Sequence, residues 1–182
     1  MSEVRDIKTI NINLFGAPGS GKSTCAPGLF HEMKKAGKRC EYVQEFAKDL
    51  VYSKDIFRLE DQTYILAKQH HPIFKLNKQV EYTINDGPFL LGLIYVSDKD
   101  RFPILEFKKF VLSLWNRYEH KNYFLKRDGK FEYENFGRNQ TLEESELIEQ
   151  EIMKMLDSHN IPYKIVNAST AKEEILEDLN II

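Results

Sequence analysis

Short apolar runs alternate along the chain with longer segments in which apolar residues recur every three or four positions. The first run, residues 10–15, is β-branched and apolar and ends in glycines, which is typical of a buried strand. Comparable short runs predict four further strands, over residues 39–44, 81–85, 122–126 and 162–167.

The segments between these runs have helical spacing. A first helix is expected over about residues 21–36, and Pro72 is expected to kink or split a later one. The sequences at 141–144 and 170–173 have the form of capping boxes, which open helices. The further helices are expected over residues 61–79, 89–96, 104–118 and 141–158 and from residue 170 onward.

Strands that alternate with helices must pair in parallel, because each connection crosses over the sheet. The pattern therefore predicts an α/β three-layer sandwich with a five-stranded parallel sheet, formed by residues 1–182 as one domain. The segment from about 127 to 140 lacks apolar periodicity and contains two glycines and several charges. A loop of that length in a compact domain is usually functional, so we expect a lid there.

Composition and charge narrow the functional classes. The net charge of −2 disfavours a dedicated polynucleotide binder, without excluding a local basic groove. The two cysteines, Cys25 and Cys40, lack the spacing of a zinc site or redox pair, which favours a reducing compartment. The polar N-terminus and the short apolar stretches indicate neither a signal peptide nor a membrane span, so we expect a cytoplasmic protein.

Residues 16–23, Gly-Ala-Pro-Gly-Ser-Gly-Lys-Ser, match the Walker A pattern and lie between the first strand and the first helix. Glycines allow successive N–H groups to point at phosphate oxygens, and the helix that follows adds its positive end. Lys22 would place a positive charge near the β- and γ-phosphates, and the Ser23 hydroxyl could bind Mg²⁺. The residues expected to bind ATP are Gly16, Gly19, Ser20, Gly21, Lys22, Ser23 and Thr24.

Two carboxylates follow predicted strands at the edge where ligands of open α/β sheets bind. Asp86 could hold Mg²⁺ directly or through water, or touch the acceptor; the structural alternative is a turn or cap before Pro88. Glu45 could accept a proton from a substrate hydroxyl that attacks the γ-phosphate. Its structural alternatives are a cap for the next helix and a surface pair with Lys48.

Arginines are expected over the transferred phosphate, because phosphoryl transfer spreads negative charge over it. Arg127 and Arg138 bracket the expected lid, and Arg117 ends the helix before the fourth strand. A lid that closes over ATP would expel water and limit hydrolysis. The structural alternative is a solvated charged loop.

Taken together, these motifs resemble the nicotinamide-riboside-kinase-like P-loop ATPases, many of which are small bacteriophage proteins. The resemblance implies an adenylate-kinase-like core with strand order 2-3-1-4-5, an arginine-bearing lid and phosphate transfer to a nucleoside- or nucleotide-like acceptor. Gly87 departs from the family pattern, in which serine is expected. The segments that carry the resemblance are residues 15–24, 44–49, 85–88 and 137–140.

The resemblance also implies a role for each matching residue. Lys22 and Ser23 would bind ATP and Mg²⁺, Asp86 would take a Walker B-like position, and Glu45 would be the catalytic carboxylate. Arg127 and Arg138 would belong to the lid. If the chain is phage-encoded, it would work in the cytoplasm of the host.

Three functions therefore compete. The leading hypothesis is an ATP-dependent kinase acting on a nucleoside, nucleotide or nicotinamide riboside. The alternatives are a regulatory ATPase that acts on a protein partner, and a kinase that acts on polynucleotide ends or modified DNA bases. The near-neutral charge disfavours the last, although residues 126–130 are locally basic. The sequence does not indicate the oligomeric state.

Overall fold

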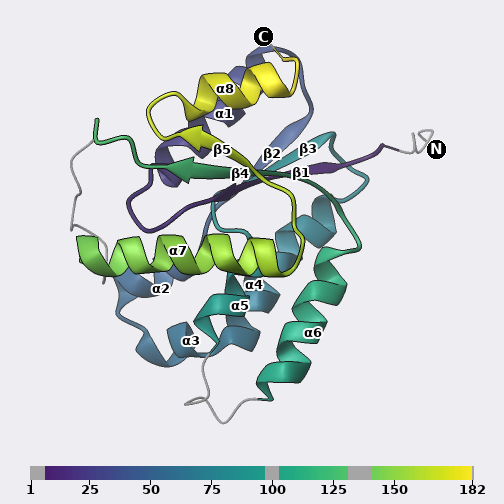
Figure 1. The fold of residues 1–182 in the computed structure, drawn as a ribbon. Coiled ribbons are helices and arrows are strands. Elements are labelled where there is room, and N and C mark those ends of the chain that lie inside the picture. Colours follow the sequence, from purple (N-terminus) through teal and green to yellow (C-terminus); the bar gives the residue numbers. More distant parts are fainter. Residues whose placement is uncertain (1–6, 97–102, 131–140, 182) are drawn as a thin grey trace, which may run out of the picture.

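Strand β1 (Ile10–Phe15) lies at the centre of a five-stranded sheet in which all paired strands run parallel. The computed structural model describes residues 7–96, 103–130 and 141–181, and Figure 1 shows the sheet edge-on between helices. The strand order is β2-β3-β1-β4-β5, so the expected order 2-3-1-4-5 is confirmed. The other strands are β2 (Cys40–Val43), β3 (Tyr82–Asn85), β4 (Glu119–Lys126) and β5 (Lys164–Asn167).

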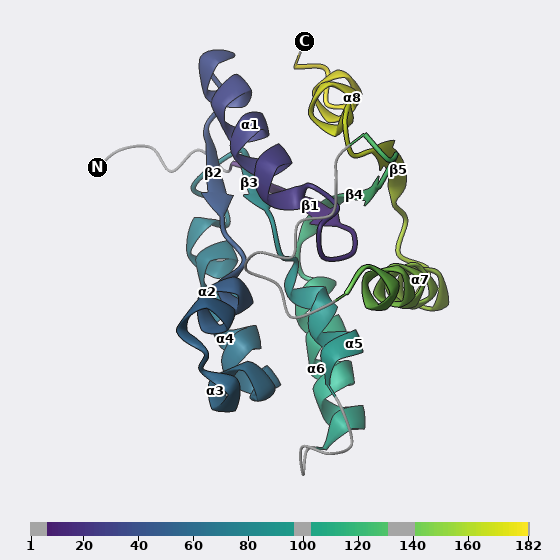
Figure 2. The ribbon, with the colours of Figure 1, turned by 90° about the vertical axis from the view of Figure 1, so that its left-hand side faces the viewer.

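Helices cover both faces of the sheet and produce the expected three layers (Figures 1 and 2). Helices α1 and α8 lie on one face, and α4 to α7 lie on the other. The short helices α2 and α3 pack against α4. The helices are α1 (Lys22–Lys35), α2 (Phe46–Ser53), α3 (Ile56–Glu60), α4 (Gln62–Leu76), the 3₁₀ turn η1 (Phe89–Leu91), α5 (Gly92–Tyr95), α6 (Ile104–Trp115), α7 (Leu142–Ser158) and α8 (Ala171–Asp178).

Each face of the sheet has its own apolar core, because successive side chains of a strand point to opposite faces. Ile12 and Leu14 of β1 belong to the core beneath α1 and α8. Phe15 belongs to the core on the opposite face, together with Phe124 and Trp115. These side chains are almost fully buried, and each contributes roughly 1.5–3 kcal/mol to stability. The two cores fix the sheet between the helical layers.

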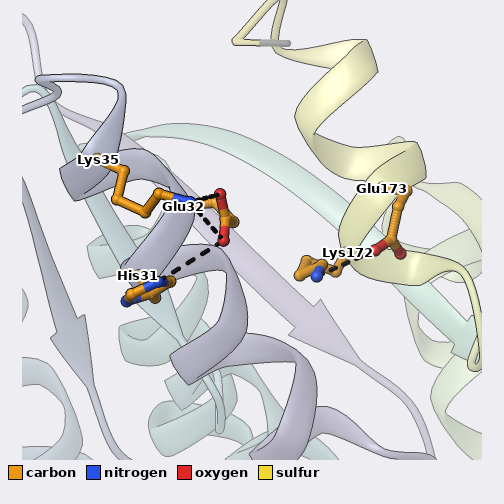
Figure 3. Close-up of polar contacts among 5 residues, drawn as sticks. All are labelled: His31, Glu32, Lys35, Lys172 and Glu173. Atoms are coloured by element: carbon orange, nitrogen blue, oxygen red, sulfur yellow. Dashed lines mark hydrogen bonds and ion pairs between the residues drawn. The ribbon is translucent and has the colours of Figure 1, made fainter.

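Charged side chains lie on the exposed sides of α1 and α8 (Figure 3). On α1, Glu32 pairs with Lys35 at 3.2 Å and lies 3.7 Å from His31. On α8, Lys172 pairs with its neighbour Glu173 at 3.0 Å. These groups are largely solvated, and exposed pairs of this kind contribute only about 0–1 kcal/mol each. The apolar core beneath them holds the two helices on the sheet.

The capping box expected at residues 170–173 does not form, although the one at 141–144 does. Thr170 accepts no capping bond; its hydroxyl instead donates to Glu174 at 2.5 Å. The Glu173 carboxylate pairs with Lys172 and so does not reach back to the helix start. The prediction for α8 was therefore wrong in the cap, and right in placing the start of the helix there.

The helices between β2 and β3 also differ in part from what the sequence predicts. α4 continues through Pro72 as one helix, so it is not split there. α2 and α3 were not assigned from the pattern, because they are short and α3 buries none of its side chains. In the part of the chain that the structure describes, no helix is both long enough and apolar enough to span a bilayer.

Buried asparagines connect the three central strands. Asn85 of β3 donates to Asn13 of β1 at 3.1 Å, and Asn13 donates to Asn122 of β4 at 2.9 Å. Asn122 in turn donates to the carbonyl of Pro162 at 2.9 Å. In the strand register, Asn13 lies opposite both Asn85 and Asn122. A slip of one residue would place these amides in the apolar core on the other face, so this row of side chains reinforces the register.

His120 extends this row at the start of β4. Its Nδ1 lies 3.0 Å from Asn13 Nδ2, which is a donor, so Nδ1 accepts and the proton is on Nε2. Nε2 then donates to the Trp115 carbonyl at 2.8 Å, and the imidazole stacks on the Trp115 indole at 3.6 Å. Burial lowers the pKa of His120 from 6.5 to about 4. The folded protein therefore holds the ring neutral.

This arrangement predicts that the free energy of unfolding falls as the pH falls from 6.5 to about 4, because the unfolded chain takes up the proton first. The expected contribution of His120 is roughly 1–3 kcal/mol over that interval. Urea unfolding of wild type and His120→Gln, followed by circular dichroism across the interval, measures it. The variant should lack this part of the pH dependence. Equal slopes for the two proteins would contradict the assignment.

Candidate nucleotide-binding site

The Walker A segment forms the loop between β1 and α1, and its glycines are required there by conformation. Gly16, Gly19 and Gly21 have φ values of 144°, 81° and 86°, a region that side chains rarely adopt. A Cβ atom on Gly16 would also lie 2.5 Å from the Ser20 hydroxyl and 2.9 Å from the Leu125 carbonyl. Glycine at these three positions therefore allows the loop to take this path.

Lys22 is the first residue of α1, and its side chain folds back over the loop. Its ammonium group donates to the carbonyls of Gly16 at 2.7 Å and Ala17 at 3.1 Å, and the residue is 8% exposed. A nearly buried positive charge at a helix N-terminus makes this loop attractive to anions. Ser23 and Thr24 are exposed on the first turn of the helix, and the Ser20 hydroxyl is buried inside the loop.

Asp86 lies directly after β3, beside the loop, and is fully buried. The Tyr42 hydroxyl donates to Oδ2 of Asp86 at 3.1 Å. The backbone N–H of Asp86 donates to the Val43 carbonyl at 3.1 Å. Burial raises the pKa of Tyr42, as does the adjacent Asp86, so Tyr42 stays a donor. Among the described residues, Oδ1 of Asp86 has no hydrogen-bond partner. A buried carboxylate oxygen without a partner fits a cation ligand.

Glu45 follows β2, one strand farther from the loop. It occupies the N-cap position of α2, as one structural alternative expected, but its side chain makes no capping hydrogen bond. The carboxylate lies instead against Gly87, where an added Cβ would be 2.7 Å from Glu45 Cγ. Burial raises the pKa of Glu45, with Lys22 opposing this shift and Asp86 adding to it. The structure therefore brings Lys22, Glu45 and Asp86 into electrostatic contact.

Lys48 is a member of this cluster that the sequence analysis considered only as a surface partner. Lys48 lies on α2, three residues after Glu45. Its ammonium group is 3.3 Å from the Ser23 hydroxyl on α1. It also lowers the pKa of Glu45. The sequence offers Lys48 as a partner for Glu45 three residues away, but only the fold shows that Lys48 reaches the Walker A helix.

The described residues at the start of the expected lid, and those that follow it, contact other parts of the chain. Asp128 accepts hydrogen bonds from Ser169 and from the backbone of Lys130. The start of the lid therefore lies beside the turn that precedes α8. On α7, which follows the lid, buried Ser145 donates to the Pro18 carbonyl at 2.7 Å, a contact that no sequence motif indicates.

The expected arginines differ in position. Arg127 directly follows β4, at the edge of the sheet where the loop lies, and is half-buried. Arg138 lies outside the described residues. Arg117 precedes β4, which pairs in parallel with β1, so it lies at the opposite edge of the sheet. The expectation that Arg117 lies over the transferred phosphate was therefore wrong.

A metal at this site would depend on few protein ligands. Within residues 7–96, 103–130 and 141–181, no group of three or more histidine, cysteine or acidic side chains could hold a metal ion. Ser23 and Asp86 could supply two oxygen ligands, which suits Mg²⁺ because that ion usually keeps waters and phosphate oxygens as its other ligands.

Several solved structures have this fold. A deoxyadenosine kinase from M. mycoides with bound dATP has a TM-score of 0.61 and 22% identity, covering 93% of this chain and 99% of that one. The NadR protein in complex with NR has a TM-score of 0.58 and 14% identity, and the match covers 90% of this chain and 46% of that one. The Mycobacterium tuberculosis APS kinase CysC, in complex with AMPPNP and APS, has a TM-score of 0.51 and 11% identity. That match covers 96% of this chain and 98% of that one. At these identities the likeness shows the fold.

The sequence comparisons gave two results. A search of curated proteins found no match. Residues 11–174 match the family model described as an AAA domain, and because this match spans most of the chain, the protein belongs to the AAA domain family.

Proposed function

We propose that the protein is an ATP-dependent kinase that transfers the γ-phosphate to a small nucleoside- or nucleotide-like acceptor, such as a nucleoside, a nucleotide or nicotinamide riboside. The observation that carries this proposal is the position of Glu45. A carboxylate with a raised pKa lies at the same sheet edge as Lys22 and Asp86, beside a phosphate-binding loop. A carboxylate at that place can take the proton of an acceptor hydroxyl that attacks the γ-phosphate.

The loop and its neighbours would bind ATP with Mg²⁺. Backbone N–H groups of the loop, other than at Pro18, and the Lys22 ammonium group would hold the phosphates, and Ser23 and Asp86 would hold the ion. When bound, Mg²⁺ neutralises charge on the phosphate oxygens. Lys48, near Ser23, adds a second positive charge at this point.

Glu45 would act as the general base. The acceptor hydroxyl oxygen attacks the γ-phosphorus, the bond to the β–γ bridging oxygen breaks, and ADP leaves. The hydroxyl proton passes to the Glu45 carboxylate. Burial raises the pKa of Glu45, which makes it a better proton acceptor than a solvated carboxylate.

The lid would exclude water during transfer. We assign this role to residues 127–140, with Arg127 and Arg138 as the cations that stabilise charge on the moving phosphate. Two contacts support its placement near the loop: Asp128, within the segment, bonds to Ser169, and Ser145, which follows it, bonds to the loop carbonyl of Pro18. The whole chain of residues 1–182 would then work as one domain.

The similar structures support the acceptor class. Their names include a deoxyadenosine kinase, an APS kinase and a protein bound to NR, so this fold serves phosphate transfer to small molecules elsewhere. Both cysteines are buried free thiols, which is consistent with action in the cytoplasm. Membership of a bacteriophage-type subgroup stays a prediction.

The first prediction from this proposal concerns the reaction. Incubation with γ-labelled ATP and Mg²⁺ against separate nucleosides, nucleotides, nicotinamide riboside, a single-stranded oligonucleotide and a duplex should label one small acceptor. Lys22→Ala should lower this transfer at least about a hundredfold, because it removes the positive charge beside the β- and γ-phosphates. Hydrolysis at one rate whatever the acceptor would contradict the proposal and favour an accessory ATPase. A labelled oligonucleotide would favour a polynucleotide kinase.

The second prediction concerns the base. Glu45→Gln keeps the size of the side chain and removes its ability to take a proton, so kcat should fall at least about tenfold. The Kd for ATP, measured by isothermal titration calorimetry, should change less than about threefold, since the loop is untouched. An unchanged kcat would remove Glu45 from the catalytic groups.

A further inference from the structure

The two peptide groups that flank Glu45 are both held by one side chain. Gln69, on α4, donates from Nε2 to the Gln44 carbonyl at 3.2 Å and accepts at Oε1 from the Phe46 N–H at 2.8 Å. Gln69 is 4% exposed, so these bonds are shielded from water. One buried amide therefore fixes the backbone immediately before and immediately after Glu45.

These bonds satisfy groups that would otherwise lack partners. The Phe46 N–H opens α2 and, like the other N–H groups of a first helical turn, has no partner within the helix. The Gln44 carbonyl lies just after β2, where the ladder has ended. Because Gln69 satisfies both, the chain leaves the sheet along a defined path, and the Glu45 side chain makes no capping bond.

The Glu45 side chain meets a second constraint at Gly87. A Cβ there would lie 2.7 Å from Glu45 Cγ and 2.8 Å from Glu45 Cβ, closer than real Cβ atoms approach. Gly87 is not among the glycines with positive φ, so its backbone does not call for glycine. The contact with Glu45 accounts for it, including the departure from the serine that the resemblance leads one to expect.

We propose that Gln69 and Gly87 are positioning residues for the Glu45 carboxylate: Gln69 fixes the backbone on both sides of it, and Gly87 leaves the space in which its side chain lies. This inference rests on the proposed function of Glu45 as the base. Displacing a catalytic group by about 1 Å can cost up to about a hundredfold in rate, so both residues should control turnover without touching the substrate.

The test is a double-mutant cycle with Glu45→Gln. Gln69→Met keeps the approximate volume of the side chain and removes both hydrogen bonds. Alone it should lower kcat about tenfold or more and change KM for ATP less than about threefold, since the loop is untouched. In the Glu45→Gln background it should cause no further loss, because the group it positions is already inactive.

Gln62→Met is the matched control. Gln62 lies on the same helix and is 6% exposed, but its amide donates to Leu59 and not to the segment around Glu45. Any loss of turnover that it causes through altered packing should therefore multiply with that of Glu45→Gln. Thermal unfolding of each variant checks that the compared proteins are folded.

Gly87→Ala provides an independent route if Gln69→Met does not fold, because it removes no hydrogen bond. It should also lower kcat about tenfold, and it should cause no further loss of kcat in the Glu45→Gln background. A second readout is the acidic limb of the kcat–pH profile. Because burial raises the pKa of Glu45, releasing the side chain to solvent should move this limb to lower pH in Gln69→Met.

The outcomes are distinguishable. If the kcat losses of Gln69→Met and Gly87→Ala multiply with the loss of Glu45→Gln, the positioning roles are overturned. The kinase proposal is then left intact. An unchanged kcat in Glu45→Gln itself would overturn both the base and its positioning. Losses confined to the background that retains Glu45, with the Gln62→Met loss present in both, would establish the inference.

Discussion

The parallel pairing of β1 with β3, and of β3 with β2, is the constraint on which the site depends. In parallel strands the carboxyl ends lie at one edge, so the loop after β1, Asp86 after β3 and Glu45 after β2 meet there although they are far apart in sequence. The buried row of asparagines reinforces this register. A slip of one residue would separate the groups as well as bury the amides in the apolar core.

The site balances charges that would be costly alone. Lys22 and Asp86 are buried, Glu45 interacts with both from the start of α2, and the Lys48 ammonium group reaches Ser23 from α2. Isolated, each buried charge would carry a desolvation cost of several kcal/mol. Together they form a cluster with two charges of each sign, which in the proposed function would exchange protein partners for phosphate and cation. The Lys22 bonds to the loop carbonyls are the contacts that bound phosphate would replace.

Local chemistry made the loop, the strands and the cap at Thr141 predictable from the sequence, because each depends on neighbouring residues. The strand order came from the resemblance and not from the pattern. Contacts between distant residues had no sequence signal: the Gln69 bonds to the segment around Glu45 and the Ser145 bond to the loop arise only when helices pack. Gly87 was noticed as a departure, and the structure supplies its reason in the side chain of Glu45.

The central claim is that the γ-phosphate passes to a second molecule and not to water. A single turnover of γ-labelled ATP, with protein in excess and the acceptor saturating, measures the fraction of label that reaches each. The account predicts that more than about nine-tenths appears in the acceptor, since a kinase site excludes water from the reacting phosphate. Label that appears mainly as inorganic phosphate, in the same proportion with and without acceptor, would contradict it.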